Sequence, residues 1–382
     1  MNSTYLSHFY QQPVENILLE FGNLASQQKN LLDLSYGDTD FTTDTNIIQA
    51  AFNDVSEGHT RYTAANGSDE FIQSVINFYK RHYGLAFRKN QVRATVGALH
   101  GIYLALRVII NEGDEVIIHE PFFSPYKTQI KEVGGTPVII PTYEKDNFQI
   151  DINLLKQAIT PKTKAIIINS PNNPTGAVFS KETLQEIANL AIQHHFFILS
   201  DEVYEAFSFD EPFTPIAAYA PENTITLNSL SKTFAMTGWR IGYMIAPEYI
   251  NEAATILNEN LTFSAPTPSQ RAAIYALNHQ EKISPDIVNI FKERLTYIEK
   301  RVTSIPFMSL SPVKGSMYAF INISKSGLTS IDFAMKLLTE QQVLVIPGKA
   351  FGNSGDNYIR LAATQELAIL KEAFNKIEKL SF

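Results

Sequence analysis

The chain has 382 residues, enough for two domains or for one large domain with a smaller partner. Its hydrophobic fraction of 45% is ordinary for a globular protein with a packed core, and its net charge of -8 argues against a general binder of nucleic acid or anionic membranes. The lack of cysteine excludes disulfide scaffolds, zinc–thiolate sites and cysteine nucleophiles. Residues 1–20 lack the pattern of a secretory signal, and no apolar run reaches the roughly 20 residues of a membrane span, so we expect a cytoplasmic location.

The N-terminal region predicts an arm followed by two helices. A turn-rich stretch at 34–41 contains Gly37, which would let a ligand approach the backbone closely, although a plain turn is the simpler interpretation. Apolar periodicity predicts helices over about 45–55 and 68–83, with a loop at 60–67 between them.

From residue 91 onward, short β-branched runs alternate with helical segments. This pattern predicts a parallel sheet covered by helices on both faces. The predicted strands are 92–96, 115–119, 137–140, 165–168, 196–199 and 225–227. A long helical stretch over about 268–303 then leads to a compact α+β region. We therefore predict an arm and small-domain segment at 1–45, a large domain at 46–270, and a linking helix with the rest of the small domain at 271–382.

Polar residues follow these strands, and ligands of parallel sheets bind at the carboxyl ends of strands. Gly97-Ala98-Leu99 follows the first strand and opens a helix whose free N–H groups could hold a phosphate. The run 169–176 follows the fourth strand, and Asp201-Glu202-Val203-Tyr204 follows the fifth. The chemically interesting groups are thus expected at one edge of the sheet.

The segment 229–240 follows the sixth strand and carries one lysine among hydroxyl groups. Lysine forms Schiff bases once burial or nearby cations lower its pKa. A hydroxyl at Ser229 and a guanidinium at Arg240 flank Lys232, and both can bind a phosphate. An aldehyde-binding lysine beside an anion site suits pyridoxal 5'-phosphate (PLP). A surface lysine in a serine-rich loop is the alternative on these residues alone.

Five further positions support a PLP site and its substrate, and four of them also have a structural alternative. Asp201 could face the pyridine nitrogen or could equally be a helix N-cap. Asn173 and Tyr204 could donate to the phenolic oxygen, although Asn173 could be only a turn former. Phe123 could stack on the cofactor or simply pack. Arg360, the one cation of an apolar run, could bind a substrate carboxylate or form an internal salt bridge.

Taken together, these motifs resemble the class I/II aminotransferases among the PLP enzymes of fold type I. The resemblance covers nearly the whole chain, and its most specific part is the lysine segment with Gly238-Trp239-Arg240-Ile241-Gly242. It implies an α/β fold in which helices cover a mostly parallel seven-stranded sheet. It also implies a smaller α+β domain formed by the N-terminal segment and the C-terminal part.

The resemblance also implies a role for each candidate residue. Lys232 would form the internal aldimine and shuttle the proton, with Asp201 and Tyr204 as its catalytic partners. The residues implied to hold the cofactor are Ala98, Leu99, Phe123, Asn173, Asp201, Tyr204, Ser229, Ser231, Lys232 and Arg240. Gly37, Asn173 and Arg360 would hold the substrate α-carboxylate. Tyr62 would reach the phosphate of a neighbouring subunit, which implies a homodimer with shared active sites, and no metal is expected.

Substrate identity is less constrained than the cofactor chemistry. Family members often have Gly-Glu-Pro-Asp-Phe where this chain has 37–41 as Gly-Asp-Thr-Asp-Phe. The segments that the resemblance places around the substrate side chain, 17–21, 36–38 and 261–265, contain no lysine or arginine, so an apolar or aromatic side chain is expected.

Transamination is the first interpretation of the reaction, and a carbon–sulfur β-lyase or an amino-acid-cyclising enzyme on the same scaffold is the alternative. A nicotinamide or nucleotide-phosphate enzyme fits poorly, because neither glycine-rich phosphate motif is present.

Overall fold

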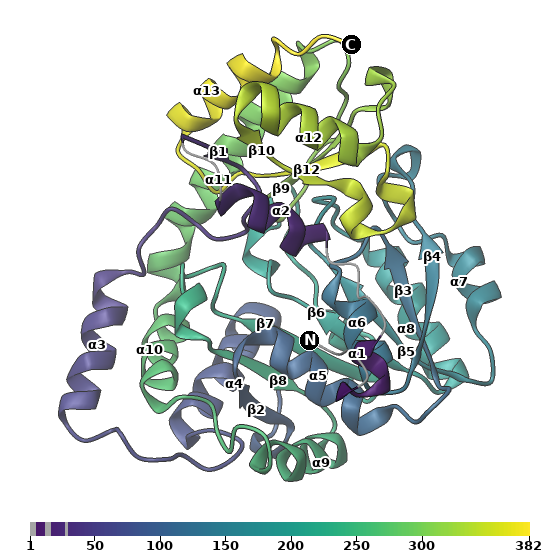
Figure 1. Cartoon of the computed structure of the whole chain (residues 1–382). Helices are drawn as coiled ribbons and strands as arrows, with labels where there is room; N and C mark the ends of the chain where they lie inside the picture. Colours follow the sequence, from purple (N-terminus) through teal and green to yellow (C-terminus); the bar gives the residue numbers. More distant parts are fainter. Residues whose placement is uncertain (1–4, 12–16, 27–29) are drawn as a thin grey trace.

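The computed structural model describes residues 5–11, 17–26 and 30–382, and its centre is a seven-stranded sheet (Figure 1). The strand order is β2-β8-β7-β6-β5-β3-β4, and β8 is antiparallel to both of its neighbours while the other pairs are parallel. The strands are β2 (Val92–Thr95), β3 (Glu115–Glu120), β4 (Thr136–Pro141), β5 (Thr163–Asn169), β6 (Phe197–Asp201), β7 (Thr224–Ser229) and β8 (Gly242–Ile245). The predicted α/β fold class is confirmed.

Both faces of this sheet are buried under helices. Neighbouring residues of one strand belong to different cores: Ile198 of β6 packs into one hydrophobic cluster and Leu199 into the cluster on the opposite face. Because side chains alternate across a strand, this explains why the strand sequences are continuously apolar rather than alternating. The helices of this region are α3 (Thr45–Ser56), α4 (Asp69–Tyr83), α5 (Gly97–Ile109), α6 (Pro125–Glu132), α7 (Ile152–Ala158), α8 (Lys181–His194), α9 (Glu248–Glu259) and α10 (Thr267–Asn278).

The C-terminal elements gather at one end of the molecule, together with α2 and β1 from the N-terminal region (Figure 1). An antiparallel sheet of order β11-β12-β9 forms here, and β1 pairs in parallel with β10. The C-terminal part of the chain thus packs with the N-terminal segment, as predicted for the smaller domain. The exact domain boundaries stay a prediction. The elements there are α2 (Ile17–Ser26), β1 (Leu32–Asp33), α11 (Gln280–Thr303), β9 (Tyr318–Asn322), α12 (Ser330–Gln341), β10 (Val343–Leu344), β11 (Ile346–Pro347), β12 (Tyr358–Ala362) and α13 (Leu367–Ile377). Helix α1 (His8–Gln11) lies instead beside α6, where the hydroxyl of Tyr10 donates to Glu132 at 2.7 Å.

Two details differ from the sequence predictions. Strand β8 was not among the predicted strands, because it has only four residues and closely follows the lysine segment; it pairs with β7, the strand just before it, and with β2, which is distant in sequence. The helical stretch predicted over 268–303 is two helices, α10 and α11, which meet at His279.

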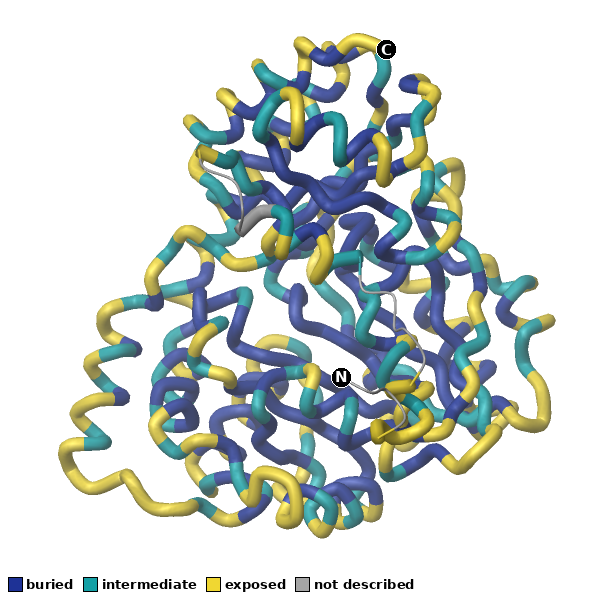
Figure 2. The backbone as a smooth tube through the Cα atoms, in the orientation of Figure 1, coloured by how far each residue is buried: buried dark blue, intermediate teal, exposed yellow. Residues whose placement is uncertain are grey.

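Figure 2 shows that the buried backbone runs through the seven-stranded sheet and continues into the C-terminal elements, while exposed residues lie on the outer helices and loops. Within the described part of the chain, no helix is both long enough and apolar enough to span a bilayer. The cytoplasmic location stays a prediction.

Candidate active site

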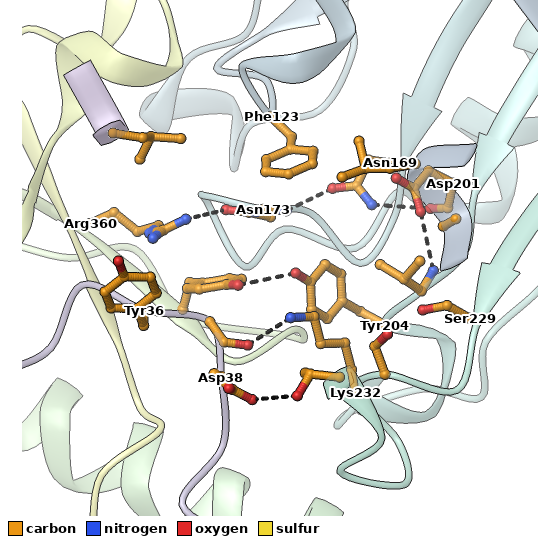
Figure 3. Close-up of a pocket in the computed structure, with 18 of the residues that line it drawn as sticks. Tyr36, Asp38, Phe123, Asn169, Asn173, Asp201, Tyr204, Ser229, Lys232 and Arg360 are labelled. Carbon is orange, nitrogen blue, oxygen red and sulfur yellow. Dashed lines mark hydrogen bonds between the residues drawn. The ribbon is translucent and has the colours of Figure 1, made fainter. Parts of the chain in front are cut away.

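A cavity of about 380 Å3 lies where the carboxyl ends of β5, β6 and β7 face the C-terminal elements (Figure 3). The structure brings every candidate residue except Tyr62 to its wall. These are Gly37, Ala98, Leu99, Phe123, Asn173, Asp201, Tyr204, Ser229, Ser231, Lys232, Arg240 and Arg360. Figure 3 shows Asp201 and Ser229 at one end of the group, Arg360 and Tyr36 at the other, and Lys232 between them.

Lys232 points into the cavity from the loop after β7. Its Nζ donates a hydrogen bond of 2.6 Å to the carbonyl oxygen of Gly37, 195 residues away in the chain. A side chain at Gly37 would collide with the hydroxyl of Tyr318 and would put its Cβ 3.5 Å from the lysine amine. Glycine at this position therefore lets the N-terminal segment approach the lysine closely.

Asp201 ends strand β6, and its carboxylate is 4% exposed. Its Oδ2 accepts a hydrogen bond of 2.5 Å from the hydroxyl of Tyr126, and its Oδ1 accepts a longer one of 3.4 Å from the backbone N–H of Val203. Burial raises the pKa of Asp201 to about 6, and the Tyr126 bond opposes that rise. The next helical turn is a 3-10 helix over Glu205–Phe207, and its N-cap residue is Tyr204. Asp201 is therefore not a helix N-cap. A buried acid of this kind is suited to facing a cationic ring nitrogen.

A second part of the cavity wall offers donors for an anion. Ser229, Ser231 and Arg240 meet the first turn of α5 there, and the first N–H groups of a helix have no partner within the helix. Gly97 begins this helix with a φ of +73°, and a Cβ on it would lie 2.8 Å from Nη2 of Arg240. The missing side chain thus makes room for the guanidinium beside the helix N-terminus. Arg240 also donates to the carbonyl oxygen of Thr237 at 2.8 Å.

Arg360 lies on β12 and is 5% exposed. It donates to Oδ1 of Asn173 at 3.1 Å and to the carbonyl oxygen of Ser35, and its guanidinium stacks on the Tyr318 ring at 4.5 Å. None of the ion pairs among the described residues includes Arg360. The internal salt bridge considered as an alternative is therefore not present. A buried cation without a counter-ion is costly, so this position favours an anionic ligand.

Asn173 and Tyr204 complete the wall between these two ends. The backbone N–H of Asn173 donates to Oδ1 of Asn169 at 2.8 Å, which fixes the loop after β5. The hydroxyl of Tyr204 lies 3.1 Å from that of Tyr318, a residue of β9. Asn173 thus does form a turn, as the structural alternative held, and its side chain also faces the cavity (Figure 3).

Tyr62 lies outside the cavity. Its side chain is 83% exposed, and its ring packs against Phe263 at a centroid distance of 4.9 Å. The predicted segment at 261–265 likewise contributes nothing to the cavity wall of its own chain. Both observations leave the predicted contact with a neighbouring subunit untested.

Sequence reasoning did not identify several residues of the wall. Tyr126 and Tyr318 each touch a predicted site residue, and Asn169 donates to the carbonyl oxygen of Asp201 at 3.0 Å. Asn169 could have been found, because it opens the polar run after β5. No local pattern distinguishes Tyr126 or Tyr318 from core tyrosines. The other wall residues that were not predicted are Gly22, Ser35, Ile102, Val203, Thr237 and Ile346. Leu18, Tyr36 and Asp38 also line the cavity, and they come from the segments 17–21 and 36–38 that were predicted to surround the substrate side chain.

Comparisons with known proteins agree with this geometry. The model of the family described as aminotransferase class I and II matches residues 29–377. The chain is 40% identical over 358 residues to an aspartate aminotransferase of Pyrococcus horikoshii, covering 93% of this chain and 92% of that one. It is 36% identical to aromatic-amino-acid aminotransferase 2 of Thermococcus litoralis, covering 94% and 93% of the two chains.

Solved structures of aminotransferases also match this fold along nearly the whole chain. The aspartate aminotransferase of Thermus thermophilus with maleate superposes with a TM-score of 0.94 at 29% identity, covering 98% of this chain and 99% of that one. A chain with this match along its length, and with a lysine, a buried acid and an unpaired arginine around one cavity, belongs to the class I and II aminotransferases, the enzymes that move an amino group between an amino acid and a 2-oxo acid.

Proposed function

We propose that PLP occupies this cavity and that Lys232 binds its aldehyde. The observation that carries the proposal is the arrangement of three groups around one cavity: the lysine amine, the buried carboxylate of Asp201 and the anion site beside Arg240. Bound PLP supplies an electron sink that stabilises negative charge at the substrate α-carbon. The room at Gly97 for the Arg240 guanidinium supports a phosphate at the start of α5.

The chain's own groups would then have distinct tasks. Asp201 would hold the proton of the pyridine nitrogen, and Tyr204 and Asn173 would donate to the phenolic oxygen. Phe123 would lie against the ring, and Lys232 would carry the proton that leaves the substrate α-carbon. The phosphate would be bound by Ser229, Ser231, Arg240 and the backbone N–H groups of Ala98 and Leu99.

The substrate α-carboxylate is proposed to bind Arg360, with Asn173 and Gly37 beside it. The guanidinium is buried, lacks an acidic partner, and lies at the end of the site opposite Asp201 (Figure 3). A carboxylate there would receive a planar pair of N–H donors.

The remaining wall near Arg360 favours an apolar or aromatic substrate side chain. Leu18 and Gly22 lie one helical turn apart on α2, Tyr36 lies opposite Gly22, and Ile346 is the strand partner of Arg360. Among the described residues of the wall, the basic side chains are Lys232, Arg240 and Arg360, and each already has a task. A second carboxylate would therefore be buried without a dedicated cation. The matching relatives carry names for both aspartate and aromatic substrates, so the names do not decide this point.

A homodimer is proposed to complete the site. Tyr62 and Phe263 form an exposed aromatic pair, which a second subunit could cover while Tyr62 reaches that subunit's phosphate. Such a dimer would share its active sites.

Two measurements test this proposal. Borohydride reduction followed by peptide mapping should find the reduced cofactor on Lys232, and a different lysine would overturn the assignment. An amino acid added alone should convert the cofactor to its amine form, seen as loss of the absorbance of the lysine-bound cofactor. A β-lyase would instead release pyruvate and keep that absorbance.

A panel of amino acids in the same assay tests the side-chain preference. Leucine, methionine or phenylalanine should have a higher kcat/KM than aspartate. An aspartate preference of about tenfold or more over all three would contradict the apolar side-chain site.

A further inference from the structure

Tyr126 makes a short contact to the acid of the site that the sequence did not reveal. Its hydroxyl donates to Oδ2 of Asp201 at 2.5 Å, across 75 residues of sequence. Both side chains are almost fully buried and both line the cavity. Among the described residues, the one other hydrogen bond to the Asp201 carboxylate is the 3.4 Å bond from the backbone N–H of Val203. Tyr126 is therefore the strong hydrogen-bond donor to this carboxylate among the described residues.

Tyr126 also contacts the ring that is placed to stack on the cofactor. The rings of Phe123 and Tyr126 meet edge to face, with centroids 5.6 Å apart and planes at 85°. Both residues come from the segment that leads from β3 into α6, where Pro125 starts the helix. Buried Ile130, one turn further along α6, anchors the same face of the helix in the core. A rigid helix start thus holds the contacts to Asp201 and to Phe123 together.

We propose that Tyr126 is a positioning residue for transamination, whose phenol holds the Asp201 carboxylate in the orientation and ionised state in which it pairs with the cofactor's pyridine nitrogen. The inference rests on the proposed PLP site. A buried carboxylate with no fixed donor tends to take up a proton and lose its negative charge. A protonated Asp201 would pair poorly with a pyridinium ion, and the ring would then withdraw electrons less well.

A phenol is suited to this task because it keeps its own proton. Burial, followed by the charge of Asp201, raises the pKa of Tyr126 well above the usual value for tyrosine. The hydroxyl therefore keeps its proton, and stays a donor, at neutral pH. The substrate carboxylate is bound at the opposite end of the cavity, so the loss of this donor should change kcat much more than KM.

The test is Tyr126→Phe, which removes one oxygen and keeps the packing of the ring. We expect the dissociation constant for PLP to rise roughly tenfold and kcat to fall by about the same factor, the order of one hydrogen bond to a charged group, with KM changed by less than about twofold. The absorbance of the lysine-bound cofactor should also shift. Unchanged PLP affinity and an unchanged spectrum would overturn the proposal.

A double-mutant cycle separates positioning from plain packing. In an Asp201→Ala background, Tyr126→Phe should alter PLP affinity by less than about twofold, because the acceptor of the Tyr126 hydroxyl is gone. The same tenfold loss in both backgrounds would overturn the proposal.

Tyr79→Phe is the matched control, since Tyr79 is a buried tyrosine whose hydroxyl donates to the buried Glu202 at 2.9 Å but which does not line the cavity. It should leave PLP affinity and spectrum unchanged, and an equal effect there would show a general loss of structure and overturn the proposal.

If Tyr126→Phe does not fold, 3-fluorotyrosine at position 126 takes its place. It preserves the ring and makes the phenol a stronger donor, so the cofactor spectrum should shift while the protein stays folded. An unchanged spectrum would contradict the inference. This result can be told apart from a wrong cofactor assignment. If the PLP site itself is wrong, borohydride reduction would attach the cofactor to a lysine other than Lys232 or to no lysine.

Discussion

Arg360→Met should abolish substrate recognition without unfolding the protein. The substitution keeps an unbranched apolar side chain on β12 but removes the guanidinium. Arg360 has no acidic partner in the described structure, so no buried carboxylate loses its counter-ion. The variant loses the hydrogen bonds from the charged guanidinium to Asn173 and Ser35, each of which contributes about 1.5–3 kcal/mol. Removal of an uncompensated buried charge opposes that loss, so the free energy of unfolding should stay within about 2 kcal/mol of the wild type.

The catalytic loss should be much larger. A substrate carboxylate bound by two N–H groups of Arg360 would lose two charge-assisted hydrogen bonds of about 1.5–3 kcal/mol each, which is roughly a 10²- to 10⁴-fold decrease in kcat/KM. The absorbance of the lysine-bound cofactor should not change, because Arg360 lies at the end of the cavity away from Asp201 (Figure 3). Steady-state kinetics, thermal unfolding and the absorbance spectrum measure the three effects.

Arg294→Met is the matched control. Arg294 is equally buried but forms an internal ion pair, with contacts of 2.8 and 2.7 Å to the two carboxylate oxygens of Asp40. Asp40 keeps contact with solvent, but the variant loses two charge-assisted hydrogen bonds of about 1.5–3 kcal/mol each, so it should be strongly destabilised. If Arg360→Met is destabilised to the same extent, or loses PLP, then Arg360 is a structural residue and the proposed carboxylate site is wrong.

Three further predictions follow from the site and its surroundings. Lys232→Ala protein mixed with Tyr62→Phe protein should regain activity with wild-type PLP affinity. If Tyr62 serves the neighbouring subunit, one site of each mixed dimer carries both substitutions and the other site carries neither. Mixed dimers that form without any recovery of activity would refute the shared site. Gly97→Ala should weaken PLP binding, since its φ of +73° disfavours alanine and the Cβ would lie 2.8 Å from Arg240, and reconstitution at wild-type affinity would contradict this reasoning. Burial raises the pKa of Glu202 from 4.5 to about 8, so the folded protein keeps a proton that the unfolded chain releases, and stability should fall as pH rises through that interval. The melting temperature of Glu202→Gln should depend less on pH than that of the wild type. If the two melting temperatures change equally with pH, Glu202 does not cause the loss of stability.

The sequence by itself determined which groups gather at one edge of the sheet. Asp201 and Asn169 end apolar strands that are continuous in sequence, and Lys232 follows a third such strand closely. Because parallel strands linked by helices end at the same edge, local periodicity is enough to place these residues together. The lysine segment, with Gly238-Trp239-Arg240-Ile241-Gly242 at its end, then carried the resemblance to the family.

Tertiary structure decided what closes the site from the other side. Arg360 meets Asn173 across 187 residues, the Gly37 carbonyl meets Lys232 across 195, and Tyr126 meets Asp201 across 75. These contacts depend on how β12, the N-terminal segment and α6 pack against the large sheet, and no local periodicity encodes that packing. The same holds for the position of β8, which pairs antiparallel with the preceding strand β7 and also with β2, a strand far from it in sequence. Residue types and their spacing therefore identified the chemistry of the site. Long-range packing decided which residue each site side chain contacts and how deeply that side chain is buried, and burial in turn sets its charge state.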